Sequence, residues 1–196
     1  MAGVGDERVK FRDDIDPTTT WLISDTHFGH KNIIDFCRRP PDVEQMMMES
    51  WAREIGPKDT VLHLGDLAYS NNAWFKNMIA PHLTGERRLL IRGNHDRGRF
   101  SFYKGSGFDL VRPFAIQWGQ DVISFSHYPW NEAEEGVMTP ENWRIHGHIH
   151  NNGYTRDAYV PFLLNHINVS VEQTQYRPVN LDLLLKGAIY GELCGL

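Results

Sequence analysis

Three short apolar runs, separated by segments of helical character, constrain the fold of this chain more than any other feature. Residues 18–23, 60–64 and 88–91 are rich in β-branched and aliphatic side chains, as strands in a protein interior are. Residues 43–55 carry apolar side chains at helical spacing, and residues 72–83 have a similar pattern. The alternation of strand and helix predicts a parallel or mixed sheet covered by helices.

The second half of the chain predicts a further sheet. Residues 112–118 and 121–126 flank Gly119-Gln120, a two-residue hairpin signal. Residues 143–145 and 167–171 are expected to add strands, and residues 181–185 a C-terminal helix. We expect this second sheet to be more antiparallel than the first and to pack against it.

Length and composition favour one compact domain. The 196 residues are 41% hydrophobic, enough for a core that needs no disulfide or structural metal ion. Residues 1–16 are expected to form a loosely ordered polar arm, and residues 17–196 a single domain. Asp42 is placed to cap the helix that follows it. The two cysteines, Cys37 and Cys194, lie far apart and are expected to be free thiols.

The charge balance argues against some partners. A formal net charge of −5 provides no basic surface for long nucleic acid or for anionic lipid, so nucleic acid is a less favoured partner. No apolar run is long enough to cross a bilayer, so we expect a cytoplasmic protein without a membrane partner. The sequence does not determine the oligomeric state.

Five segments, each at the end of a predicted strand, carry residues that can bind a metal ion. The segments are Asp25-Thr26-His27, Gly65-Asp66, Gly93-Asn94-His95-Asp96, His127 and Gly147-His148-Ile149-His150. They offer carboxylate oxygen, amide oxygen and imidazole nitrogen but no thiolate, a donor set that suits manganese, iron, zinc or nickel. On extended backbone, residues i and i+2 point to the same side, so Asp25 with His27, and His148 with His150, are expected to converge.

This series of motifs resembles the calcineurin-like metallophosphoesterases, specifically the small bacterial and phage phosphodiesterases, over about residues 20–170. The resemblance implies a four-layer αββα sandwich of two mixed β-sheets flanked by helices, with two divalent metal ions between the sheets. It implies one metal ion bound by Asp25, His27, Asp66 and His150, and a second bound by Asp66, Asn94, His127 and His148. Asp66 would bridge the two ions, and a hydroxide held between them would be the nucleophile.

The resemblance also implies a catalytic role for the motif that contains Asn94. His95 matches a histidine that is not a ligand and would protonate the leaving oxygen or stabilise the developing charge. Asp96 would orient His95. Manganese is the first expectation for the two ions, with iron, zinc and nickel as alternatives.

Several functions remain open on the same centre. The first hypothesis is a phosphodiesterase on small, nucleotide-like diesters such as cyclic nucleotides, and the alternatives are a phosphomonoesterase and a nuclease. A protein of this fold that has lost its metals and only binds partners is disfavoured, because every ligand position is filled. A histidine-rich metal buffer is disfavoured because the ligands extend from Asp25 to His150.

Other residues near the motifs have simpler expected roles. His63, inside an apolar run, is expected to be a hydrogen-bonded core histidine. The roles of His30 as a pocket residue or a surface residue are equally favoured. A solvated basic cluster is favoured over phosphate binding for Arg38, Arg39 and Arg97.

Overall fold

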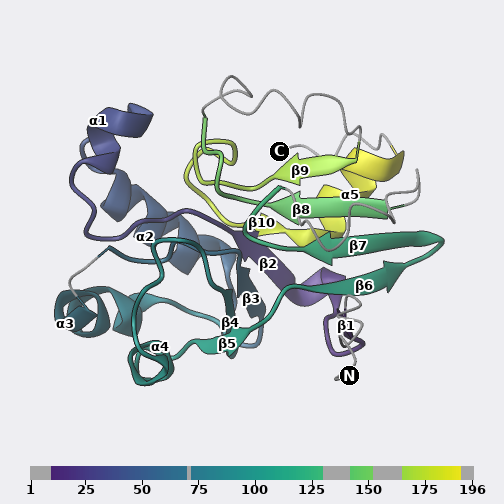
Figure 1. Cartoon of the computed structure of the whole chain (residues 1–196), viewed down its shortest axis with the longest axis horizontal. Coiled ribbons are helices and arrows are strands. Elements are labelled where there is room, and N and C mark those ends of the chain that lie inside the picture. Colours follow the sequence, from purple (N-terminus) through teal and green to yellow (C-terminus); the bar gives the residue numbers. More distant parts are fainter. Residues whose placement is uncertain (1–9, 70–71, 130–141, 152–164, 191–196) are drawn as a thin grey trace, which may run out of the picture.

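The computed structural model describes residues 10–69, 72–129, 142–151 and 165–190. Two five-stranded sheets, which share one apolar core, form the centre of this part of the chain (Figure 1). The first has the order β10-β2-β3-β4-β5: β10 (Val179–Asn180), β2 (Thr20–Ile23), β3 (Thr60–His63), β4 (Arg87–Ile91) and β5 (Asp109–Val111). The second has the order β1-β6-β7-β8-β9: β1 (Lys10–Phe11), β6 (Phe114–Trp118), β7 (Asp121–Phe125), β8 (Asn142–His146) and β9 (His166–Asn168).

The first sheet is parallel from β2 to β5, and β10 joins its edge in the antiparallel direction. Its central strands are apolar on both faces because both faces are covered. Ile23 and Val61 point into a core shared with helices, whereas Leu22 and Leu62 point into the core shared with the second sheet. The predicted strands at residues 18–23, 60–64 and 88–91 therefore exist, with slightly different ends.

Helices cover the outer face of this first sheet. They include α1 (Ile33–Cys37), α2 (Val43–Glu54), α3 (Asn72–Trp74) and α4 (Phe100–Gly105), while η1 (Pro17–Thr19) is a short 3-10 turn before β2. Helix α2 buries Val43, Met47 and Trp51 against the sheet, as its spacing predicted. Asp42 precedes α2, but its side chain makes no capping hydrogen bond, so that expectation was wrong.

The helix predicted for residues 72–83 is broken into three pieces. Helix α3 is followed by a π-helical turn, η2 (Phe75–Ile79), and a 3-10 turn, η3 (Ala80–His82). Pro81 explains the end of regular helix, because proline has no N–H to donate and its ring collides with the preceding turn. The segment still buries Phe75 and Ile79 in the core of the first sheet.

The second sheet is less antiparallel than we expected. Only β6 and β7 are antiparallel, joined by the predicted hairpin, while β7, β8 and β9 run parallel and β1 pairs parallel with β6. The end of the N-terminal arm therefore contributes a short edge strand. The last helix, α5 (Leu181–Tyr190), adds Leu181 and Leu185 to the core between the sheets.

This topology brings six strand ends together. Parallel neighbours end at the same edge of a sheet, so β2, β3 and β4 deliver their loops to one place, and β7, β8 and β9 do the same. A bridge between Ser24 and Ser170 joins the loop after β2 to the loop after β9. The expected sandwich of two mixed sheets flanked by helices is confirmed. Within the described ranges, no helix has the length and apolar character needed to cross a bilayer.

Candidate metal centre

The loops after β2 and β3 lie side by side and are tied to each other through their backbones. The N–H of Asp25 donates to the carbonyl of Gly65 at 2.9 Å, and the N–H of His27 donates to that of Asp66 at 2.9 Å. These bonds continue the pairing of the two parallel strands beyond their ends. As a result, Asp25, His27 and Asp66 are fixed relative to one another before any side chain interacts.

A left-handed backbone is common to five of the predicted site residues. The φ angles are 60° at Asp25, 50° at His27, 56° at Asp66, 72° at His148 and 49° at His150. Each such residue costs roughly 1–3 kcal/mol, and strain of this kind concentrates at functional sites. From the sequence, we expected extended backbone to bring Asp25 close to His27 and His148 close to His150. That reason was wrong, because tight turns with positive φ angles bring these residues together.

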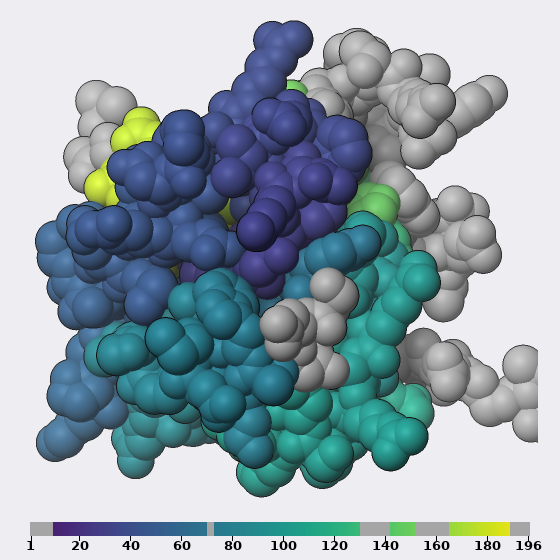
Figure 2. All heavy atoms as spheres, turned by 90° about the vertical axis from the view of Figure 1, so that its left-hand side faces the viewer, coloured from purple at the N-terminus to yellow at the C-terminus, as the bar shows by residue number. Residues whose placement is uncertain are grey.

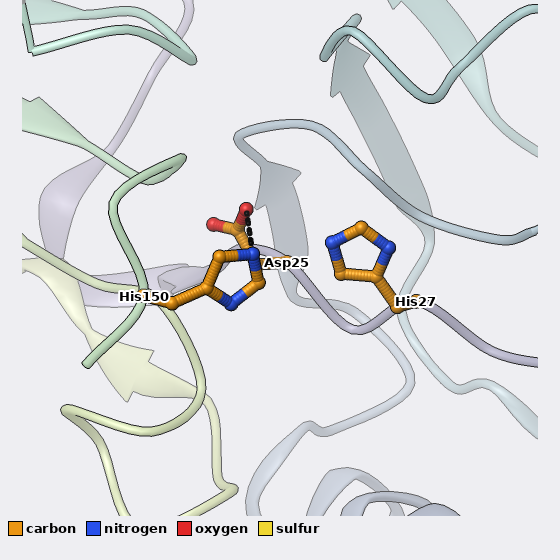
Figure 3. A group of neighbouring side chains, drawn as sticks. All are labelled: Asp25, His27 and His150. Carbon is orange, nitrogen blue, oxygen red and sulfur yellow. Dashed lines mark ion pairs between the residues drawn. The ribbon is translucent and has the colours of Figure 1, made fainter. Parts of the chain in front are cut away.

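Asp25, His27 and His150 form the first donor group (Figure 3). His150 Nε2 lies 3.5 Å from Asp25 Oδ1, and the rings of His27 and His150 are stacked with centroids 5.1 Å apart. His27 is only 2% exposed, yet neither of its ring nitrogens has a hydrogen-bond partner among the described residues. A buried imidazole with unused nitrogens is what a metal ion would complete.

Asn94, His127 and His148 form the second donor group. Asn94 Oδ1 lies 3.1 Å from His127 Nε2 and 3.0 Å from His148 Nδ1, and the two ring nitrogens are 3.2 Å apart. His127 Nδ1 lies 2.8 Å from the carbonyl of Leu64, which can only accept, so this nitrogen carries the proton. The lone pair of His127 therefore lies on Nε2, toward Asn94 and His148.

Asp66 lies between the two donor groups. Its Oδ2 is 3.5 Å from His27 Nε2 and 3.6 Å from His127 Nε2. Its Oδ1 accepts a hydrogen bond of 2.8 Å from the N–H of His95. One carboxylate oxygen thus faces a histidine of each group, while the other oxygen fixes the turn that contains Asn94.

The spacing of the donor atoms fits divalent metal ions. For metal–ligand bonds of about 2.0–2.2 Å, neighbouring ligand atoms of a tetrahedral or octahedral site lie about 2.8–3.6 Å apart. The separations within and between the two groups, 3.0 to 3.6 Å, fall in that range. Asp25, Asp66 and His127 also form a set with metal-binding spacing, so the two donor groups adjoin each other.

Two glycines allow the backbone to approach the carboxylates. A Cβ atom at Gly93 would overlap Oδ1 of Asp66, and one at Gly147 would overlap Oδ2 of Asp25 and Oγ of Ser24. Oδ2 of Asp25 also accepts a hydrogen bond of 3.0 Å from the N–H of His148. Only glycine leaves room for these loops to close around the carboxylates.

Burial sets the pKa of several of these groups. Because it disfavours the charged ring, burial lowers the pKa of His27 to about 2 and that of His148 to about 4. Burial also raises the pKa of Asp66 above its usual value. Both imidazoles are therefore neutral, with lone pairs available to a cation.

The pKa values of Asp25 and His150 shift in the directions opposite to those of Asp66 and His27, because Asp25 and His150 interact with each other. Burial alone would raise the pKa of Asp25, but His150 and the other nearby histidines hold it below its usual range. Burial would lower the pKa of His150, but hydrogen bonds to Cys37 and Glu172 and the charge of Asp25 raise it to about 10. A cation that binds His150 Nε2 must therefore displace a proton.

His95 and Asp96 occupy the turn beside Asp66. The His95 ring lies near that of His27, with centroids 5.1 Å apart. Asp96, expected to orient His95, instead accepts from three backbone N–H groups: those of Asp66 at 2.7 Å, Gly93 at 2.8 Å and Leu67 at 3.1 Å. Burial raises the pKa of Asp96 to about 6. Its carboxylate clamps the turn to the loop after β3.

Several other expectations are settled by burial. His63 is fully buried and is a core histidine, as expected, with Nε2 3.0 Å from Oγ1 of Thr26. His30 is only 9% exposed, stacks on Tyr69 and lines a cavity, so of its two expected roles the structure favours that of a pocket residue. Arg38 and Arg97 are exposed, but Arg39 is buried and lines a cavity beside His27, so it is not part of a solvated cluster. Cys194 lies outside the described residues, and Cys37 is a buried free thiol.

Glu172 is a residue of the site that sequence reasoning missed. Its Oε1 lies 2.9 Å from Nδ1 of His150 and accepts from Nε of Arg39 at 2.8 Å. A signal was available, because Glu172 follows the last predicted strand just as Asp25 and Asp66 follow theirs. The buried ion pair with Arg39 was not accessible from the sequence.

Comparisons with known proteins identify a family that this chain matches. A family model described as calcineurin-like phosphoesterase matches residues 18–188. The chain is 35% identical over 174 residues, 85% of this chain and 89% of the relative, to the uncharacterized protein MJ1445 of Methanocaldococcus jannaschii. It is 26% identical over 166 residues, 68% of this chain and 78% of the relative, to the Gene 66 protein of Mycobacterium phage L5.

A solved structure shows the same fold. The crystal structure of AQ665 from Aquifex aeolicus, a protein of unknown function, superposes with a TM-score of 0.65 at 30% sequence identity. The match covers 82% of this chain and 94% of the other.

Proposed function

The chain belongs to the calcineurin-like phosphoesterase family and is a metal-dependent phosphoesterase, and from this premise we propose that it uses two divalent cations to hydrolyse small phosphodiesters. Nucleotide-like diesters such as cyclic nucleotides are the proposed substrates. Asp25, His27, Asp66 and His150 would hold one cation, and Asp66, Asn94, His127 and His148 the other.

The position of Asp66 is the observation that carries the proposal. Its Oδ2 lies 3.5 Å from a histidine of the first donor group and 3.6 Å from a histidine of the second. Two cations about 3.5–4 Å apart need an anionic group between them to offset their repulsion. When bound, such a pair of cations activates water and neutralises the charge of a phosphate ester.

Two residues of the turn after β4, His95 and Asp96, would contribute a proton for the leaving oxygen and the position of the turn. The hydrogen bond from the N–H of His95 to Asp66 holds the backbone of His95 in the turn, and the imidazole, with its centroid 5.1 Å from that of His27, would protonate the leaving oxygen. Asp96 holds the same turn through its bonds to the N–H groups of Gly93 and Asp66. We therefore assign Asp96 to positioning and His95 to proton transfer.

Aromatic side chains around the centre support a nucleotide-like substrate. Tyr69, 39% exposed, stacks on His30 with ring centroids 3.9 Å apart and an interplanar angle of 16°. Tyr128, 37% exposed, lies against His127 and His148 with centroids 4.9 and 4.7 Å away. Exposed aromatic rings of this kind bind bases by stacking, at roughly 1–3 kcal/mol per base.

A cavity beside the first donor group offers room for such a substrate. It has a volume of about 790 Å³ and is lined by Thr26, His27 and His30 on one side and by Val43 and Met48 of α2 on the other. Both segments lie on the face seen in Figure 2, where α2 is blue and the residues before it are purple. The volume is within the usual range of small-ligand pockets, roughly 300–1,000 Å³. The net charge of −5 disfavours long nucleic acid.

A substrate panel tests the proposal. The purified protein with Mn²⁺ is offered 2′,3′- and 3′,5′-cyclic nucleotides, the corresponding nucleoside monophosphates and short oligonucleotides. Asp66→Asn, prepared in parallel, serves as the control for contaminating hydrolases. We expect turnover of cyclic diesters that the variant lacks. Strict preference for monoesters or for oligonucleotides would overturn the proposed substrate class.

A further inference from the structure

A buried ion pair connects the two sides of the first donor group. Nε and Nη2 of Arg39 donate to Oε1 of Glu172 at 2.8 and 2.6 Å, and Nδ1 of His150 lies 2.9 Å from the same oxygen. The Arg39 side chain is 0% exposed and that of Glu172 is 3% exposed. Desolvating two charges is costly, so a pair this deeply buried must be held by specific partners.

The same guanidinium also holds the loop after β2. Nη2 of Arg39 donates to the carbonyl of Asp25 at 2.7 Å, and Nη1 donates to that of Thr26 at 3.0 Å. Arg39 therefore fixes the strained backbone at Asp25 while it holds Glu172 against His150. Asp25 follows a strand of the first sheet and His150 one of the second, so the pair sets the distance between ligands from different sheets.

The bond to Glu172 determines which nitrogen of His150 faces the centre. A carboxylate only accepts, so the proton of this bond is on Nδ1. The other nitrogen, Nε2, is then the one that faces Asp25 Oδ1, 3.5 Å away, on the side where the first cation would bind. Without a fixed acceptor at Nδ1, a neutral imidazole can exchange tautomers and turn its ring, and it then presents a proton to the cation.

We propose that Glu172 and Arg39 are positioning residues that hold His150 with Nδ1 protonated and Nε2 free to bind the first cation. This inference rests on the proposed function, because it assumes that His150 is a ligand. Glu172 and Arg39 act through His150 and Asp25, which belong to the first cation site. We therefore expect that only this one of the two sites depends on Glu172 and Arg39.

The decisive variant removes both charges together. Glu172→Met alone would leave the buried Arg39 unpaired and destabilise the protein, so it is combined with Arg39→Met, which keeps the volume and removes both ions. Asp182→Asn is the matched control, because Asp182 is a buried carboxylate of α5 that pairs with Lys186 at 2.7 Å. Titration calorimetry with Zn²⁺ measures both cation sites. ¹⁵N-detected spectra of the Zn²⁺-loaded protein observe the His150 ring.

The proposal expects a selective result. In the wild type, the Nδ1–H of His150 gives a slowly exchanging signal, and two Zn²⁺ ions bind. In the double variant, that signal is lost and the affinity of one site falls about 10–100-fold while the other is unchanged. Asp182→Asn should keep both affinities and the signal. A folded double variant with two unchanged affinities and an intact Nδ1–H signal would overturn the proposal.

A second variant keeps the proposal testable if the double variant does not fold. Glu172→Gln retains an oxygen acceptor without the charge, so it should weaken the same single site by a smaller factor. Unchanged Zn²⁺ affinities in Glu172→Gln would overturn the proposal. Failure of the proposed function looks different: the wild type would then turn over no diester, although the calorimetry and spectra of its variants still report on His150.

Discussion

Replacing Asp66 by Asn should disrupt the metal centre without changing the fold. The Oδ1 atom of Asp66 accepts from the N–H of His95 at 2.8 Å, and an Asn oxygen can accept the same bond. The Oδ2 atom, which faces His27 and His127 at 3.5 and 3.6 Å, would become an uncharged NH₂ group. The variant should therefore keep its turn and lose the anionic bridge.

The magnitude follows from binding to the folded state alone. A cation present at about 100 times its Kd stabilises the native protein by about 2.7 kcal/mol per site. For a chain of 196 residues, 1 kcal/mol raises Tm by about 2–4 °C, so one site contributes about 5–11 °C and two contribute about twice that. Without the bridge, we expect the Mn²⁺-induced shift to fall below that of one site.

Differential scanning calorimetry with increasing Mn²⁺, together with the metal content of the dialysed protein, measures this effect. In the absence of metal, the wild type and Asp66→Asn should unfold within a few degrees of each other, because the two side chains have the same size. Asp182→Asn, far along the chain on α5, should keep the full shift. If Asp66→Asn retained the wild-type shift and two bound ions, the bridging role would be refuted.

Four further predictions follow from the same structure. His95→Ala should lower kcat by about 10²–10⁴-fold while both cations still bind, as metal analysis would show; a loss of metal would instead assign His95 to ligation. Gly93→Ala should reduce metal content, because its Cβ would overlap Oδ1 of Asp66, and unchanged content would contradict the close approach. Tyr69→Leu should raise the KM of a cyclic nucleotide by about 5–150-fold and leave that of methyl 4-nitrophenyl phosphate, which has no base, unchanged. Burial lowers the pKa of His63 to about 3 from 6.5 in the unfolded chain. The contribution of neutral His63 to the free energy of unfolding is therefore complete above pH 6.5 and declines by up to about 1.4 kcal/mol per pH unit as the pH falls toward 3. Acid-unfolding curves of His63→Gln should lack this part of the pH dependence, and an unchanged dependence would contradict the assignment.

The strain at the donor residues gives the centre its rigidity. Asp25, His27 and Asp66 keep positive φ angles because backbone bonds between the loops after β2 and β3 hold them there. The free energy that this backbone costs is offset by the cores on both faces of the first sheet. The donor atoms are thus placed by the fold, and a cation need not organise them.

The sequence by itself determined which residues gather. Asp25, Asp66 and Asn94 each follow a buried apolar run, and parallel strands necessarily end at the same edge of a sheet. The donor types are also local information, because carboxylate, amide and imidazole groups define the class of metal ion. His63 could be assigned to the core for the same reason, since it lies within an apolar strand.

Only the tertiary structure decided how the donors turn toward each other and what supports them. The sign of φ at Asp25 depends on a bond to Gly65 in another loop, which no local pattern encodes. The partner of Arg39 is Glu172, 133 positions away. A buried ion pair forms only where the fold removes both charges from water and brings them into contact, and that property belongs to the packed molecule, not to either residue.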